Sequence, residues 1–159
     1  MIFEEIFDCS NLIEINEICD YGNIPFPHDY KSIISKYGGI CINNFLYILS
    51  PNATNKYLNS EYRFTSMRDA FYQTDIGIDF RCFDGKDGLY PWGITDNGDE
   101  LYWELGERTQ VVIFAARHAT YVKLEMSLTE VLREIFINGN TYNIFPDDLF
   151  LEEVSMVQY

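Results

Sequence analysis

The clearest helical pattern of the chain lies between Pro27 and Gly38. Proline suits the first helical position, and glycine readily adopts the left-handed conformation that ends a helix. We therefore predict a helix that begins at Pro27 and ends before Gly38. Its apolar positions recur at intervals of three and four residues, at Tyr30, Ile33, Ile34 and Tyr37.

Other segments also favour helix. Apolar residues in the first twenty positions form two short stripes, and Tyr21-Gly22-Asn23 breaks the pattern. Another helix is predicted from about Tyr57 to Thr74. Ser127-Leu128-Thr129-Glu130 is a capping-box sequence, which predicts a helix start. The inward face of that last helix consists of Leu128, Val131, Leu132, Ile135 and Phe136.

Alternation of apolar and polar residues predicts strands elsewhere. A short strand fits residues 78–82, and residues 84–88 fit a turn. From Tyr142 onward the pattern favours a strand and a short helical turn near Pro146. Two pairs of strands are separated by short turns and are predicted as hairpins: residues 40–42 with 45–49 around Asn43-Asn44, and residues 111–116 with 119–124 around Arg117-His118.

A further hairpin is predicted between Trp92 and Trp103, which flank an acidic turn. Asn97-Gly98 lies within this turn, and both residues tolerate positive φ. The segment after the turn has the pattern of a half-buried strand. Its apolar positions Leu101, Trp103 and Leu105 alternate with Tyr102 and Glu104.

The order of these elements predicts the fold class. Consecutive strands are joined by short turns, which favours a mainly antiparallel sheet, and helices precede and follow the strands. We predict an α+β fold with the helices packed on one face of the sheet. The chain has 159 residues and contains no linker-like segment, so we expect a single domain over residues 1–159.

The chain is strongly acidic, with 11 basic and 25 acidic residues and a formal net charge of −14. Residues 1–30 contain seven acids and no Lys or Arg, and residues 75–107 contain nine acids and two bases. Such a charge repels nucleic acid and anionic membrane, and it attracts a basic protein. The simpler interpretation is that the charge serves solubility alone.

The cysteines do not suggest a cofactor site or an oxidising compartment. Cys9, Cys19, Cys41 and Cys82 form no Cys-x-x-Cys pair, and no His lies at ligand spacing. We therefore predict no metal and no cofactor. The N-terminus lacks the positive region of a signal peptide, and no apolar run approaches the roughly 18 residues of a membrane span. We expect a cytoplasmic protein.

No catalytic motif is recognisable. Neither His28 nor His118 has a neighbouring Ser or Cys motif, and each is expected to be exposed. The acidic stretches at 84–87 and 96–99 lack the ligand order of a calcium-binding loop. We predict a protein that is not an enzyme, because no nucleophile and base stand out as a pair.

The candidate binding residues lie in and around the tryptophan hairpin. Trp92 and Trp103 could line a partner-binding cleft, since aromatic side chains supply large contact areas, or could pack the core of the sheet, which we favour. The neighbouring acids could form a patch that mimics phosphate, or could lie at a solvated turn with Asp99 bonded to turn amides. These acids are Asp96, Asp99, Glu100, Glu104 and Glu107.

Three motifs of this chain resemble those of the SUKH superfamily, the Smi/Knr-type proteins. They are Phe26-Pro27-x-Asp29-Tyr30-Lys31, Tyr37-Gly38-Gly39, and Leu89-Tyr90-Pro91-Trp92-Gly93-Ile94-Thr95-x-Asn97-Gly98-Asp99-x-Leu101-x-Trp103. The resemblance runs from about Ile15 to Phe136. The family usually has Leu where this chain has Phe26, and residues 52–86 match no part of its pattern.

The resemblance implies a SUKH (Smi/Knr-like) fold and a role in binding. Bacterial members are similar to immunity proteins, which bind and neutralise a toxin domain, often a nuclease, made by the same cell. Fungal members resemble regulatory scaffolds in cell-wall synthesis. We therefore expect an immunity-type protein that occludes a basic toxin domain. The alternatives are a regulatory scaffold and a small-molecule-binding module with an aromatic-lined cleft.

Overall fold

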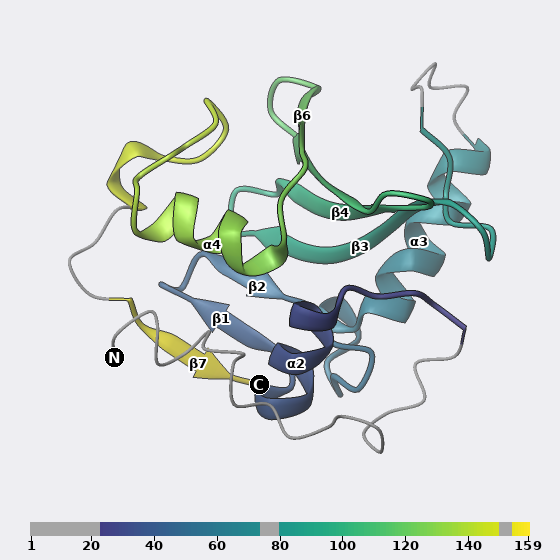
Figure 1. The fold of residues 1–159 in the computed structure, drawn as a ribbon, viewed down its shortest axis with the longest axis horizontal. Coiled ribbons are helices and arrows are strands. Elements are labelled where there is room, and N and C mark those ends of the chain that lie inside the picture. Colours follow the sequence, from purple (N-terminus) through teal and green to yellow (C-terminus); the bar gives the residue numbers. More distant parts are fainter. Residues whose placement is uncertain (1–22, 74–79, 150–153) are drawn as a thin grey trace.

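The computed structural model describes residues 23–73, 80–149 and 154–159, and Figure 1 shows how they are arranged. The helix predicted over the first twenty residues lies outside these ranges. Residues 78 and 79 of the strand predicted at 78–82 also lie outside them.

An antiparallel sheet of seven strands forms the centre of the described part, in the order β6-β5-β4-β3-β2-β1-β7. From β1 to β6 each strand pairs with its neighbour in sequence, whereas β7 returns to pair with β1 (Figure 1). The predicted antiparallel sheet of an α+β protein is confirmed. The strands are β1 (Ile40–Ile42), β2 (Leu46–Ile48), β3 (Gly88–Thr95), β4 (Glu100–Leu105), β5 (Gln110–Ala115), β6 (Thr120–Leu124) and β7 (Met156–Gln158).

The helices of the described part agree with the sequence patterns. The helix predicted to begin at Pro27 begins one residue later, at His28, and Pro27 takes the N-cap position. Gly38 ends this helix with a φ of 71°. Ser127 and Glu130 form both reciprocal hydrogen bonds of a capping box. The helices are α2 (His28–Tyr37), α3 (Ser60–Gln73) and α4 (Leu128–Phe136), with 3-10 turns η1 (Lys56–Leu58) and η2 (Asp147–Leu149).

The hairpin turns follow from residues that tolerate positive φ. Asn43 and Asn44 both have positive φ, 51° and 52°, in the three-residue connection between β1 and β2, where the Phe45 amide donates a hydrogen bond to the Ile42 carbonyl. The turn between β3 and β4 differs from the expectation, because only Gly98 has positive φ (84°). Hydrogen bonds from the Thr95 amide to the Asp99 carbonyl and from the Gly98 amide to the Thr95 carbonyl close a three-residue loop.

The strand predicted at 78–82 is not formed within its described residues. Arg81 and Cys82 run beside β3, where Cys82 and Leu89 form an isolated bridge. The turn predicted at 84–88 is present, since the Asp84 carboxylate accepts hydrogen bonds from the amides of Lys86 and Asp87.

The main core lies between one face of the sheet and the helices α2 and α4. Trp92 and Trp103 stack there with ring centroids 5.3 Å apart, and the ring of Tyr30 from α2 meets Trp103 edge-on at 6.0 Å. The inward positions predicted for α4, from Leu128 to Phe136, are all buried in this core.

The opposite face of the sheet, called the second face below, carries a smaller apolar cluster. It is formed by Met67 of α3 with Leu89, Tyr102 and Val112. Neighbouring side chains of a strand point to opposite faces, so Tyr102 lies on the other side of the sheet from Trp103. The expectation of helices on one face therefore holds for α2 and α4, and α3 is an exception.

One carboxylate joins the first turns of α2 and α4. Asp29 Oδ2 accepts a hydrogen bond from the Thr129 amide at 3.0 Å and one from the Thr129 hydroxyl at 3.4 Å. The first amides of a helix lack partners within the helix, and the helix dipole favours negative charge at this end. Asp29 therefore supplies a hydrogen-bond acceptor to a first-turn amide of α4, although it lies 100 residues away in sequence.

Replacing Asp29 with Ala should lower the free energy of unfolding by about 1–2 kcal/mol, because the Thr129 amide and hydroxyl lose their acceptor. Urea unfolding followed by tryptophan fluorescence measures this change. Asp69→Ala is the matched control, since Asp69 is exposed on α3, and it should shift stability by less than about 0.5 kcal/mol. Equal losses for the two variants would contradict a capping role for Asp29.

The capping box makes part of the stability depend on pH. Hydrogen bonds from the Ser127 amide and hydroxyl lower the pKa of Glu130. Their stabilisation is present above the ordinary glutamate pKa of about 4.3 and is lost as the pH falls through the lower pKa of the folded state. Glu130→Gln should be less stable than the parent near pH 7, and urea unfolding should show that the difference shrinks toward about pH 3.

Candidate functional site

The two tryptophans are core residues. Trp92 and Trp103 are 0% and 1% exposed, respectively. They stack against each other beneath α2, on the inner face of the sheet. Both tryptophans therefore pack the core, as favoured from the sequence, and Trp103 also borders a surface hollow between Pro27 and Gln110.

Asp99 is also an internal residue, only 2% exposed. Its Oδ2 atom accepts a hydrogen bond from the Thr95 hydroxyl at 3.0 Å, and its Oδ1 atom accepts one from the Ala116 amide at 3.3 Å. Thr95 precedes the β3–β4 turn, and Ala116 begins the β5–β6 turn. Asp99 thus holds two adjacent turns together, and its carboxylate is not available to a partner.

The four other acids of the hairpin do not form one patch. Asp96 and Glu107 are exposed but lie beyond opposite ends of β4. Glu100 accepts a hydrogen bond from the Tyr102 hydroxyl, and Glu104 is paired with Lys123. The acids that could have formed a patch on this hairpin are therefore dispersed over it.

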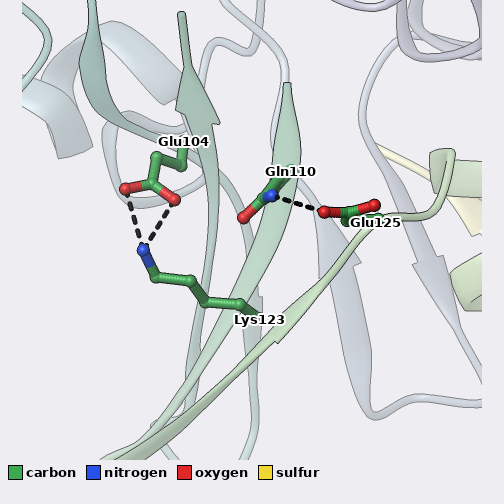
Figure 2. Close-up of polar contacts among 4 residues, drawn as sticks. All are labelled: Glu104, Gln110, Lys123 and Glu125. Carbon is green, nitrogen blue, oxygen red and sulfur yellow. Dashed lines mark hydrogen bonds and ion pairs between the residues drawn. The ribbon is translucent and has the colours of Figure 1, made fainter. Parts of the chain in front are cut away.

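Figure 2 shows the pairing of Glu104 on the second face of the sheet. Lys123 reaches from β6 and contacts both carboxylate oxygens of Glu104, at 3.0 and 2.9 Å. Gln110 of β5 lies beside them and donates a hydrogen bond to Glu125 at 3.2 Å. The charge of Glu104 is therefore compensated by Lys123, whereas Glu125 accepts from a neutral amide.

Most of the excess negative charge lies outside the described residues. The described ranges contain all 11 Lys and Arg residues but only 15 of the 25 acids. The remaining ten acids belong to residues 1–22, 74–79 and 150–153, which contain no Lys or Arg.

A cavity of about 320 Å³ lies on the second face of the sheet, between α3 and the strands β3, β4 and β5. Its polar side chains are Arg63 and Ser66 of α3 with Glu100 and Tyr102 of β4. The other lining residues are Met67, Ala70, Phe80, Leu89, Pro91, Gly93, Ile94, Val112 and Phe114.

Strand register explains the floor of the cavity. Tyr102 lies between Pro91 and Val112 in one row across three strands, and Glu100 lies between Ile94 and Phe114 in the next. The sequence patterns did not point to this site. The one signal for it was the apolar run of β5, because a strand with apolar residues on both faces is covered on both sides.

The Tyr102 hydroxyl organises the polar end of this cavity. Burial raises the pKa of Tyr102, and the nearby Glu100 carboxylate raises it further, whereas the positive charge of Arg63 lowers it. The phenol therefore remains protonated and donates a hydrogen bond to Glu100 Oε2. A carboxylate, a guanidinium and a phenol lie beside an apolar floor, which suits binding of a ligand with polar and apolar parts.

His28, His118 and Cys41 do not line this cavity. His28 and His118 are exposed, as expected. Burial raises the pKa of the Cys41 thiol, which disfavours the reactive thiolate. Within the described ranges, no three His, Cys, Asp or Glu side chains are grouped so that they could hold a metal ion. The helices described are too short or too polar to cross a membrane.

Comparison of the chain with protein-family models, with curated proteins and with solved structures found no match.

The role of Asp99 can be tested against that of Asp96. Asp99→Ala should lower the free energy of unfolding by about 1–3 kcal/mol, because a buried hydroxyl and the Ala116 amide lose their acceptor. Asp96→Ala removes an exposed carboxylate that interacts with the Tyr47 hydroxyl at the surface, and it should lower stability by less than about 1 kcal/mol. Thermal and urea unfolding measure both. A larger loss for Asp96→Ala would contradict the internal role of Asp99.

Proposed function

We propose that this chain is an immunity-type binding protein that neutralises a cognate toxin domain by steric and electrostatic occlusion. The observation that carries the proposal is the net charge of −14, most of which is concentrated in segments without any Lys or Arg. The SUKH-like motifs support the same role, because bacterial members of that superfamily are similar to immunity proteins.

The physical basis is long-range attraction followed by blocking. A toxin that cleaves nucleic acid needs a basic cleft to hold phosphates. Electrostatic attraction draws an acidic protein to such a cleft and raises the rate at which the two proteins associate. Once bound, it excludes the nucleic acid by occupying the same surface, and this requires no catalytic group.

The binding test is co-purification with a toxin domain encoded by a neighbouring gene, combined with co-expression in a cell that the toxin kills. We expect a stable complex and rescue of growth. An unrelated protein of similar net charge serves as the control, and it should not rescue. Absence of a toxin gene nearby, or failure of rescue while the chain is folded and expressed, would contradict the proposal.

The electrostatic part makes a kinetic prediction. Raising the salt concentration from about 0.05 to about 0.5 M should lower the association rate constant by roughly 10-fold or more, whereas the dissociation rate should change only a few-fold. Surface plasmon resonance measures both rates. An association rate that is independent of salt would leave occlusion possible but would exclude electrostatic steering.

A second function, a small-molecule-binding module, is favoured by the cavity between α3 and the sheet. Its volume of about 320 Å³ falls within the range of ligand sites, and its apolar floor with a few polar side chains is typical of them. This cavity replaces the tryptophan cleft as the location of such a site.

A further inference from the structure

The cavity on the second face of the sheet has an apolar end and a polar end. Met67, Leu89 and Val112 form the centre of its apolar wall. The ring of Phe80 adds an aromatic edge to this part of the lining. At the other end, Glu100 lies opposite Ile94 of β3 and accepts a hydrogen bond from the Tyr102 hydroxyl.

Arg63 reaches the same cavity from α3. It lies four residues before Met67 and therefore projects from the same face of the helix. Met67 packs against Tyr102, so Arg63 lies one helical turn from that contact. Its charge acts on Tyr102, and both Arg63 and Glu100 line the cavity.

Arg63 and Glu100 each keep hydrogen-bonding atoms that have no partner among the described residues. Arg63 Nε donates a hydrogen bond to the Tyr57 carbonyl at 2.8 Å, and its two terminal amino groups donate to no other described residue. Glu100 Oε2 accepts from Tyr102, whereas Oε1 accepts from no group in the described ranges. One cation and one anion that both act on Tyr102 are therefore free to contact a ligand in the same largely apolar cavity.

This pair of charges restricts the chemistry of a ligand. A purely apolar ligand would displace water from both charges and leave them unpaired, which is costly. A ligand with a single charge would leave one of them unpaired. A peptide carries its ammonium and carboxylate at opposite ends, whereas a free α-amino acid carries both on one carbon atom.

We propose that the cavity binds a free α-amino acid with a large apolar side chain. Its carboxylate contacts Arg63, its ammonium group contacts Glu100, and its side chain lies on the apolar floor. A guanidinium matches a carboxylate with two parallel hydrogen bonds. The volume of about 320 Å³ corresponds to roughly ten water molecules, and the rings of Phe80 and Phe114 favour an aromatic or branched side chain.

This inference rests on the second candidate function, the small-molecule-binding module, and is independent of toxin binding. The test is isothermal titration calorimetry of the full chain with a panel of L-phenylalanine, L-tryptophan, L-leucine and L-methionine. At least one should bind, with a dissociation constant between about 10 µM and 1 mM, as expected for so small a ligand.

Ligand analogues that lack one charge test each contact. For L-phenylalanine these are 2-phenylethylamine, without the carboxylate, and 3-phenylpropanoate, without the ammonium group; if another amino acid binds best, its corresponding analogues are used. Each analogue should bind the parent protein about 10-fold or more weakly than the amino acid. Arg63→Gln should bind the amino acid no more tightly than the amine that lacks the carboxylate. Glu100→Gln should bind the amino acid no more tightly than the carboxylate analogue that lacks the ammonium group.

Matched variants separate these effects from general changes in charge. Arg68→Gln removes another cation from α3, and Glu107→Gln removes an exposed acid, yet neither residue lines the cavity. Both should retain the affinity of the parent within about 2-fold. Ser66→Leu should fill the cavity and weaken binding, whereas Thr65→Leu, at the preceding position of α3 and outside this cavity, should not.

The outcomes are distinguishable. If no amino acid of the panel binds at about 10 mM, the proposed ligand class is wrong. If the singly charged analogues bind as tightly as the amino acid, the cavity is a small-molecule site but the paired-charge inference is wrong. Circular dichroism of each variant confirms that it is folded, and Arg63→Lys should restore part of the affinity lost in Arg63→Gln.

Discussion

The stacked indoles of Trp92 and Trp103 are the contact on which the arrangement of the structure depends. They fill the centre of the inner face of the sheet, and Tyr30 of α2 closes over Trp103 while its hydroxyl donates to the Leu49 carbonyl. Burial of such large rings is among the strongest contributions to a core of this size. Among the helices of the described ranges, α2 and α4 cover this face, and α3 alone lies on the other face, where its incomplete coverage leaves room for a cavity.

Features determined by neighbours in sequence were predictable. The capping box at Ser127 and Glu130 and the Asn43-Asn44 turn depend on contacts within a few residues, and both are present. The cavity was not predictable, because it depends on how α3 lies against strands that follow it in the chain. The irregular pairing between Pro91 and Gly93 also could not be read from the pattern of β3, although it decides which of its side chains face α3.

The dispersal of the hairpin acids has a simple geometric cause. Acids that are close in sequence are not close on the surface of a sheet, since alternate residues of a strand point to opposite faces and the turn directs others inward. Asp99 points into the protein, Glu100 lies beside Tyr102, and Glu104 is neutralised by Lys123. A count of carboxylates along the chain therefore describes the electrostatic field at long range better than it describes any contact surface.

The pairing of β7 with β1 has a consequence for how the molecule is made. Tyr159 covers Gly39, where any larger residue would overlap its ring, and its hydroxyl donates to the Ile48 carbonyl across a separation of 111 residues. During synthesis, the outer hydrogen-bonding groups of Ile40–Ile42 therefore have no strand beside them until the chain has been translated beyond Gln158. An unpaired edge of this kind is the part of a nascent sheet most open to chaperones and to mispairing with other chains.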